Sequence, residues 1–297
     1  MKKLIGVDIG GTKVAVGLIS PNGEVLEELI VPSDGTNREK MFEIVVEAIQ
    51  ALLEKTNLTA EEIALGVGVP GIVDSKNGIA VFKNNLNWEN FPIRERLQAA
   101  FPEVETIRMD NDVIHAGFAE WKASGLSAEE SLVFLTVSTG IASPIFEGGV
   151  PIRGRGLAGE IGLVPVRTQH RTKTERLEFV ASGSALQEKA QARYGDATMT
   201  TALLFENYEK KEERAVAIID DFLDSLTHGI YVIVSLINPT QIVLGGSVMM
   251  LNPHLLPLLK ERLSQEILPV QQESVASLVL SKYANNASLV GAGLSVL

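Results

Sequence analysis

Short apolar segments separated by small-residue turns form the beginning of the chain. Three of them, at about 3–9, 13–20 and 24–31, have the length and composition of β-strands. Asn22-Gly23, between the second and third segments, is a strong signal for a tight hairpin. The first segment brings the carboxylate of Asp8 close to the turn Gly10-Gly11-Thr12. The pattern therefore predicts consecutive antiparallel strands with an acidic side chain beside a glycine turn.

The same order of strand, turn and strand returns later in the chain. An apolar segment at 132–137 leads into Ser138-Thr139-Gly140, and another at 241–244 ends in Gly245-Gly246-Ser247. Glycine lets backbone N–H groups approach an anion because no Cβ stands in the way. A carboxylate such as that of Asp8 is a suitable ligand for hydrated Mg²⁺. Each turn alone is more typical of an ordinary strand connection, but the ordered set suggests a nucleotide held between two related halves.

Helical patterns alternate with further strand patterns between these segments. Thr36 and Glu39 have the spacing of a capping box, and apolar residues follow at intervals of three and four. Later a strand at 104–109 precedes a helix predicted over 113–124. Alternating strands and helices, together with hairpins, predict an α/β protein with a mixed sheet. Ligands in such folds bind beyond the carboxyl ends of strands, where the acidic residues and glycine turns fall.

Asp112 is the candidate catalyst. It follows a predicted strand and precedes a helix N-terminus, whose dipole favours an ionised carboxylate. A carboxylate in this position can accept the proton of an alcohol that is being phosphorylated. Aspartate at such a position more commonly serves only to cap the helix, and Asn111 is equally typical of a cap or a turn. Taken alone, this segment therefore leaves the capping role ahead.

Composition narrows the class of protein. The chain has 297 residues, of which 45% are hydrophobic and 21% charged, as in a soluble globular protein. The net charge of −11, without a basic stripe, argues against nucleic acid as a partner. No cysteine is present, which excludes disulfides, thiolate metal sites and cysteine nucleophiles. The start of the chain lacks the pattern of a signal peptide, and no apolar stretch has the length of a membrane span, so we expect a cytoplasmic protein with no membrane partner.

Together these segments resemble the ROK (repressor, open reading frame, kinase) family of bacterial sugar kinases, and in particular its glucokinase-like branch. The resemblance runs almost end to end through seven ordered motifs: Asp8-Ile9-Gly10-Gly11-Thr12-Lys13, Gly68-Val69-Pro70-Gly71-Ile72-Val73, Asn85-Leu86-Asn87-Trp88, Asn111-Asp112, Ser138-Thr139-Gly140-Ile141, Leu157-Ala158-Gly159-Glu160-Ile161-Gly162 and Leu244-Gly245-Gly246-Ser247. It implies an actin/hexokinase-like α/β fold, in which a duplicated ribonuclease-H-like fold forms two domains flanking a nucleotide and sugar cleft. We expect a smaller domain comprising 1–115 and the C-terminal helix at 285–297, and a larger domain comprising 116–284.

The resemblance also implies roles for individual residues. It implies ATP-dependent phosphorylation of a hexose at its 6-hydroxyl, with Asp112 as general base and with Mg²⁺ carried by ATP near Asp8. Four residues match sugar-binding positions: Asn85, Asn111, Glu160 and Glu178. Nine match positions that bind the nucleotide and its Mg²⁺: Asp8, Gly10, Gly11, Thr12, Lys13, Thr139, Gly140, Gly245 and Gly246. The expected partners are a small-molecule sugar and ATP, and homodimers are common in the family.

One departure from the family pattern concerns zinc. The family continues Gly-Glu-x-Gly with a histidine and a cysteine-rich zinc segment, whereas Leu163 follows Gly162 here and no cysteine comes after it. His170 alone cannot form a tetrahedral zinc site, so we expect no structural zinc. We expect packing by Leu163, Val164 and Leu177 to hold this loop instead.

A second departure lies after the Ser138-Thr139-Gly140 turn. Ala142 stands where the family has a glycine, which requires a negative φ at that position. Pro144 removes a backbone donor at the start of a strand, where proline suits an edge better than a centre.

Three interpretations follow from the sequence. An active, zinc-free hexose kinase keeps Asp112, the phosphate-binding turns and the sugar-facing carboxylates, and it is preferred. A catalytically weak or inactive sugar-binding sensor would explain Leu163, Ala142 and Pro144. An actin-like ATPase or scaffold would not need the sugar-binding residues. Glucose is the favoured substrate, with N-acetylmannosamine, fructose or a β-glucoside as alternatives.

Overall fold

The computed structural model describes residues 2–81, 86–166 and 174–297. The chain divides into two compact units. Unit 1 comprises Met1–Leu126, Arg153–Leu157 and Asn285–Leu297, and unit 2 comprises Ser127–Ile152 and Ala158–Ala284. Unit 1 thus continues beyond the boundary expected at 115, because helix α3 (Asp112–Ser124) packs extensively against the C-terminal helix α11 (Ala287–Leu294).

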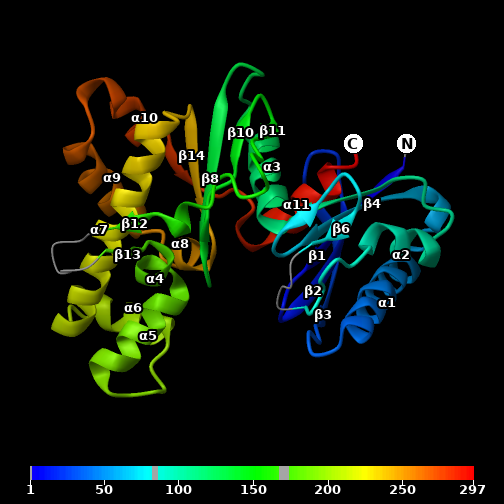
Figure 1. The fold of residues 1–297 in the computed structure, drawn as a ribbon, viewed down its shortest axis with the longest axis horizontal. Helices are drawn as coiled ribbons and strands as arrows, with labels where there is room; N and C mark the ends of the chain where they lie inside the picture. The colour runs from blue at the N-terminus through cyan, green and yellow to red at the C-terminus, as the bar shows by residue number, and fades with distance from the viewer. Residues whose placement is uncertain (1, 82–85, 167–173) are drawn as a thin grey trace. The chain divides into compact units, whose positions relative to one another are not determined.

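Unit 1 is built on a five-stranded mixed sheet in the order β3-β2-β1-β4-β7 (Figure 1). β1 pairs antiparallel with β2 and parallel with β4, and β2–β3 is antiparallel while β4–β7 is parallel. The elements not yet given bounds are β1 (Lys3–Ile9), β2 (Lys13–Ile19), β3 (Val25–Pro32), α1 (Arg38–Thr56), η1 (Ala60–Glu62), β4 (Ile63–Val69), β5 (Val73–Asp74), β6 (Ile79–Ala80), α2 (Ile93–Ala100) and β7 (Ile107–Asn111). Alternate residues of β1 face opposite sides of the sheet: Ile5, Val7 and Ile9 join the core under α1, whereas Gly6 and Asp8 face α11.

Unit 2 repeats this sheet in the order β11-β10-β8-β14-β15. Its two antiparallel pairs precede β8 in the order and its two parallel pairs follow it, as they do around β1. The strands are β8 (Ser131–Val137), β9 (Ile141–Ala142), which pairs with β8, β10 (Ile145–Glu147), β11 (Val150–Pro151), β14 (Gln241–Gly245) and β15 (Leu278–Leu280), and β12 (Pro165–Val166) pairs with β13 (Glu175–Arg176) apart from the sheet. The internal repeat and the mixed α/β class predicted from the sequence are therefore confirmed.

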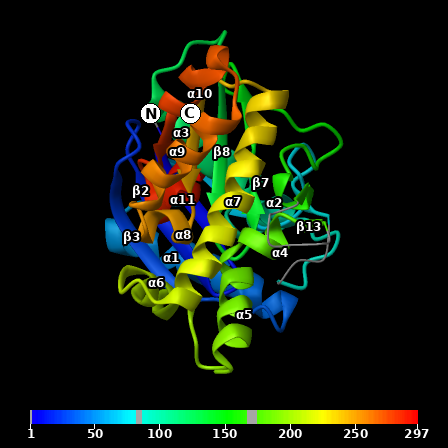
Figure 2. The same ribbon diagram turned by 90° about the vertical axis from the view of Figure 1, so that its left-hand side faces the viewer.

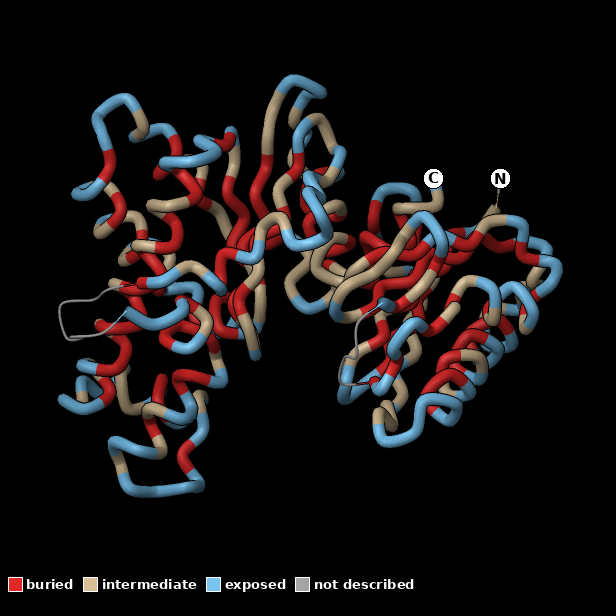
Figure 3. Tube along the Cα trace, in the orientation of Figure 1, coloured by how far each residue is buried: buried red, intermediate tan, exposed pale blue. Residues whose placement is uncertain are grey.

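Helices cover the sheet of unit 2. The longest is α7 (Glu213–Leu236), which runs beside α9 (Leu255–Glu266) in Figure 2. The others are η2 (Ile161–Leu163), α4 (Glu178–Ala181), α5 (Gly183–Tyr194), α6 (Thr201–Glu209), α8 (Ser247–Leu251), η3 (Pro269–Gln271) and α10 (Gln272–Ala276), with η4 (Ala284–Asn286) leading to α11. Figure 3 shows that the strands and the inner helix faces are buried while the loops are exposed. Over the described ranges, no helix has both the length and the apolar character needed to cross a bilayer.

Two observed element boundaries, the start of α1 and the bounds of β7, differ from the predicted ones. Helix α1 is capped by Asn37, whose side chain accepts hydrogen bonds from the N–H groups of Glu39 and Lys40. The capping box predicted for Thr36 is wrong, because its hydroxyl donates to Asp34 instead. The strand expected at 104–109 lies at Ile107–Asn111, so Asp110 and Asn111 belong to the sheet rather than to the loop after it.

Glycines allow α11 to lie very close to its neighbours in unit 1. A Cβ on Gly6 of β1 would come within 2.1 Å of the Leu289 carbonyl oxygen, and one on Gly66 of β4 within 1.8 Å of the Ala292 carbonyl oxygen. A Cβ on Gly291 of α11 would come within 1.7 Å of the His115 carbonyl oxygen in α3. Since real Cβ atoms do not approach backbone this closely, the position of α11 depends on these glycines.

We predict that Gly66→Ala lowers the free energy of unfolding by about 3 kcal/mol or more, because the added methyl group would overlap the backbone of α11. Urea unfolding followed by circular dichroism measures the change. Gly17→Ala on β2 is the matched control, since its Cβ would mainly meet the movable end of the Leu289 side chain, and its loss should be smaller. Equal losses in the two variants would contradict this packing argument.

Candidate functional site

The first part of the candidate site is the β1–β2 hairpin of unit 1. Its turn is closed by a hydrogen bond of 2.9 Å from the Gly10 N–H to the Lys13 carbonyl oxygen, and Gly11, Thr12 and Lys13 are exposed. Asp8 lies near the end of β1, and its Oδ1 accepts a 2.7 Å hydrogen bond from the Ser288 hydroxyl of α11. The tight glycine turn thus presents exposed backbone beside a fixed carboxylate.

Burial raises the pKa of the Asp8 carboxyl, although the Ser288 hydrogen bond and the positive charge of Lys13 both act to lower it. A partly desolvated carboxylate gains much from a nearby cation. Its oxygen atoms are of the kind that Mg²⁺ prefers, so Asp8 fits the role expected of it near the metal of a Mg–nucleotide complex.

The second part is the junction between β7 and α3. Asn111 is the N-cap of α3, and its Oδ1 accepts hydrogen bonds from the N–H groups of Val113 (2.9 Å) and Ile114 (3.1 Å). Its Nδ2 donates to the Gly71 carbonyl oxygen at 2.9 Å. Asn111, and not Asp112, therefore caps the helix, which settles a choice that the sequence left open. One Nδ2 proton of Asn111 has no partner within the described part of the chain.

Asp112 is the first residue of α3 and its carboxylate makes few contacts. Its Oδ1 accepts a 2.9 Å hydrogen bond from the Val113 N–H. Burial, reinforced by the negative charge of Asp8, raises the pKa of the Asp112 carboxyl to about 7. Such a carboxyl exchanges a proton readily near neutral pH, which suits a general base better than a structural cap.

Two carboxylates of unit 2 form the third part. Glu178 begins α4, and its Oε2 accepts a 2.9 Å hydrogen bond from the Ile141 N–H, directly after the Ser138-Thr139-Gly140 turn. A Cβ on Gly140 would lie 2.5 Å from that same oxygen, so the glycine makes room for the carboxylate. The turn itself is closed by hydrogen bonds from Ser138 N to Gly140 O and from Gly183 N to Ser138 O.

Glu160 lies at the start of η2 and is positioned by the glycine before it. Gly159 has a φ of +86°, and its carbonyl oxygen accepts hydrogen bonds from both the N–H and the hydroxyl of Ser143. Partial burial raises the pKa of the Glu160 carboxyl, and the negative charge of Glu178 raises it further. The two carboxylates therefore lie near each other within unit 2.

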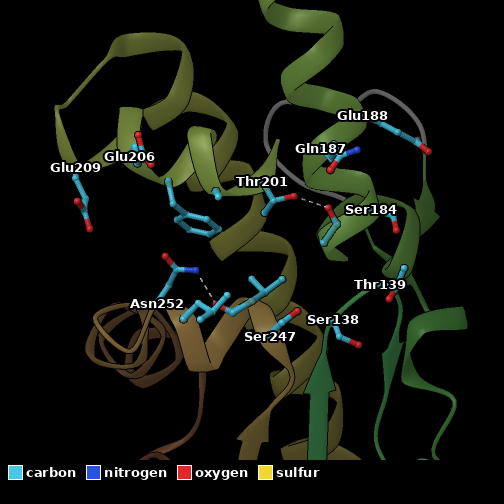
Figure 4. A pocket seen from close by; sticks show the side chains of 15 residues that line it. Ser138, Thr139, Ser184, Gln187, Glu188, Thr201, Glu206, Glu209, Ser247 and Asn252 are labelled. Carbon is cyan, nitrogen blue, oxygen red and sulfur yellow. Dashed lines mark hydrogen bonds between the residues drawn. The ribbon is translucent and has the colours of Figure 1, made fainter. Parts of the chain in front are cut away.

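A cavity of about 670 Å³ opens beside the Ser138-Thr139 turn (Figure 4). Its walls come from that turn and from helices α5, α6 and α8, and its polar side chains include Ser184, Gln187, Thr201, Glu206, Ser247 and Asn252. Gly246 (φ +83°) connects β14 to α8, and a Cβ there would lie 2.3 Å from the Val137 carbonyl oxygen. The volume is within the range usual for nucleotide and other small-molecule sites.

The structure therefore groups the predicted residues by unit. Asp8, Asn111 and Asp112 belong to unit 1 with the Gly10 turn, while Thr139, Gly140, Glu160, Glu178, Gly245 and Gly246 belong to unit 2. Asn85 and His170 lie outside the described residues. Sequence reasoning missed the cavity walls on α5, α6 and α8, because their polar residues are spaced as on ordinary solvated helices. Glu209 ends α6 and lines the cavity as well.

The two departures from the family pattern have clear local consequences. Leu163 is 47% exposed, so the packing expected of it is wrong, whereas Leu177 is fully buried and the partly buried Val164 packs against the same core. Ala142 does not have a positive φ, so the backbone there accommodates a side chain. Pro144 bonds to β8 through its carbonyl oxygen, which accepts from the Phe134 N–H, so the missing donor is not needed for that contact.

Comparison with known proteins agrees with this arrangement. The ROK family matches residues 4–296. The chain is 26% identical to a glucokinase of Halalkalibacterium halodurans (97% of this chain and 93% of the relative) and 29% identical to an N-acetylmannosamine kinase of Escherichia coli (99% and 98%). A solved ROK hexokinase of Thermus thermophilus superimposes with a TM-score of 0.81 at 28% identity, covering 99% of this chain and 97% of that one. The fold is therefore actin/hexokinase-like, as expected, and the chain belongs to the ROK family.

Proposed function

We propose that this protein is a sugar kinase that transfers the γ-phosphoryl group of ATP to the 6-hydroxyl of a hexose, with glucose as the favoured substrate. The observation that carries the proposal is the Asp112 carboxyl, whose pKa is raised to about 7 at the start of α3. Membership of the ROK family and similarity to sugar kinases support the reaction class. An ATPase or scaffold with no sugar substrate would not need the two neighbouring carboxylates of Glu160 and Glu178.

Asp112 acts as the general base in this proposal. Phosphoryl transfer requires mainly positioning and charge neutralisation, together with a group that accepts the proton of the attacking hydroxyl. The ionised Asp112 carboxylate takes that proton from the 6-hydroxyl as the oxygen attacks phosphorus. Asn111 holds the carboxylate in place by capping α3, and its remaining Nδ2 proton is available to a sugar oxygen.

Glu160 and Glu178 accept hydrogen bonds from the other sugar hydroxyls. Glu178 is well suited to this because its Oε2 is already fixed by the Ile141 N–H, which leaves Oε1 to face a ligand. The Leu163 side chain offers no hydrogen bond to a ligand. N-Acetylmannosamine, fructose and β-glucosides are the alternative substrates, and similarity to kinases named for N-acetylmannosamine and β-glucosides supports two of them.

The cavity lined by α5, α6 and α8 receives the nucleoside of ATP, and the glycine turns receive its phosphates. Backbone N–H groups at the Gly10 and Thr139 turns approach phosphate oxygens because small side chains leave them accessible. When bound with ATP, Mg²⁺ neutralises phosphate charge, and Asp8 is the residue that would hold it. We expect no structural zinc, in keeping with the absence of cysteine.

A sugar-binding sensor is the less favoured alternative. Its main support was the substitution of Ala142 and Pro144 near the nucleotide turn, and neither residue strains the backbone or removes a needed bond there. Leu163 remains its one favourable observation.

Asp112→Asn should lower kcat by about 10²- to 10⁴-fold, because the amide cannot accept the hydroxyl proton. Sugar affinity should change little, since the side chain keeps its shape. Sugar-phosphate formation and calorimetric sugar binding measure the two effects, and Glu105→Gln, at a carboxylate whose side chain is 76% exposed, is the control. Unchanged kcat in Asp112→Asn would exclude this residue as the base.

The rate should depend on pH through the same carboxyl. Because the pKa of Asp112 is raised to about 7, the base is protonated and inactive below that pH and ionised above it. We predict that kcat/KM for the sugar falls about tenfold per pH unit below pH ~7 and levels off above it. If the fall in kcat/KM is centred near pH 4 instead, Asp112 titrates as an ordinary aspartate or is not the base.

Ser184→Trp should raise KM for ATP by about tenfold or more while leaving KM for the sugar nearly unchanged, because the indole would fill the cavity beside Thr139. Ala192→Trp, at an exposed position on the same helix that does not line the cavity, is the control. Steady-state kinetics with each substrate varied in turn measures both constants. If KM for ATP is the same in the two variants, the nucleoside binds elsewhere.

A further inference from the structure

A bidentate ion pair joins Arg153 to Asp110, which lies two residues before the proposed base Asp112. The guanidinium of Arg153 donates from Nη1 to Asp110 Oδ1 at 2.9 Å and from Nη2 to Asp110 Oδ2 at 2.5 Å. The Asp110 side chain is only 12% exposed, whereas that of Arg153 is 40% exposed. The planar guanidinium bonds both carboxylate oxygens at once, so it fixes the orientation of the Asp110 side chain and also neutralises its charge.

Arg153 reaches Asp110 from a distant part of the sequence. The segment Arg153–Leu157 belongs to unit 1, although the chain on either side of it belongs to unit 2. The segment turns sharply at two glycines with positive φ, Gly154 (+54°) and Gly156 (+100°), and the Gly156 N–H donates to the Arg153 carbonyl oxygen at 2.8 Å. This turn holds the Arg153 backbone in place, and Arg155 in the same turn is exposed.

The ion pair continues into the residues that hold Asp112. Asp110 Oδ1, which accepts from Arg153, also accepts a 2.8 Å hydrogen bond from the Asn111 N–H. Asn111 in turn caps α3 through Val113 and Ile114, which directly follow Asp112. An unbroken chain of hydrogen bonds therefore leads from the Arg153 guanidinium to the start of the helix that carries Asp112.

The negative charge of Asp110 needs the positive charge of Arg153 because other carboxylates lie nearby. Asp110 is buried two residues from Asp112, and Asp8, on the side of α11, brings a third carboxylate near Asp112. The imidazole of His115 also faces Asp110 and Arg153, but burial lowers its pKa and keeps it neutral. Within the described part of unit 1, Arg153 is the one cation bonded to Asp110. A buried carboxylate without its partner would draw in water or turn away, and Asn111 would lose its support.

We propose that Arg153 is a positioning residue for the reaction: by holding Asp110 it fixes the Asn111 cap and hence the direction of the Asp112 carboxylate. This inference rests on the proposed kinase function. It gives the Arg153–Leu157 segment a role in organising the residues around the base.

Arg153→Gln, Arg155→Gln and the double variant Asp110→Asn/Arg153→Gln test the proposal. Arg153→Gln should lower kcat per folded molecule by about 10- to 100-fold, with a smaller change in KM for the sugar, because a shift of the base of about 1 Å has effects of this size. Arg155→Gln should stay within about twofold of wild type, as an exposed substitution in the same turn. The double variant should recover part of the lost kcat, since the neutral amide that replaces the Asp110 carboxylate can still accept from the Asn111 N–H.

A purely structural role predicts a different result: lower melting temperatures in Arg153→Gln with wild-type kcat per folded molecule, which would overturn the proposal. An equal loss in Arg155→Gln would overturn it too. Hydrogen–deuterium exchange of the peptide covering residues 110–116 provides a readout independent of turnover. Faster exchange in Arg153→Gln than in Arg155→Gln supports the proposal, and equal exchange contradicts it. If wild-type protein phosphorylates no sugar, the proposed function fails, and the exchange result alone decides the inference.

Discussion

The close contact between helix α11 and the sheet of unit 1 determines where the acidic residues of that unit lie. Gly6 and Gly66 let the helix approach two strands to backbone contact, and Gly291 does the same for α3. The helix then brings Ser288 to Asp8 and supports the helix that begins at Asp112. Bulkier residues at these positions would move α11 outward and separate the two carboxylates from their neighbours. The proposed chemistry thus depends on contacts made by residues that carry no functional group.

The same arrangement has a cost in stability. Burial raises the pKa of both Asp8 and Asp112, so the folded protein binds protons more tightly than the unfolded chain. Stability from these groups is therefore present at low pH and is lost as pH rises from the ordinary value of 3.8 towards about 7 for Asp112. At the pH where the base is active, unit 1 holds several carboxylates close together. The Arg153–Asp110 pair and the Ser288 hydroxyl each offset part of that repulsion.

Local patterns were sufficient to predict most elements of the fold. A short apolar segment predicted β1 at 3–9 correctly, and the repeated order of strand and turn predicted the second sheet. The β7–α3 boundary was harder, because Asp110 looks like a loop residue until Arg153 neutralises it within the sheet. Residues from distant segments could not be grouped from spacing alone. Ser288 next to Asp8 and the cavity walls on α5, α6 and α8 depend on tertiary packing that leaves no local signal. Leu163 was expected to be buried because it is apolar, yet it is exposed directly after Gly162, which lies against Glu178.

The most direct test of the central claim is sugar-dependent release of ADP from Mg·ATP, measured over a panel of hexoses, amino sugars and β-glucosides. The account predicts that ADP release above the sugar-free background occurs with at least one hexose, glucose first, and yields an equal amount of the 6-phosphate. ADP release that is the same with and without every sugar of the panel would contradict a hexose kinase.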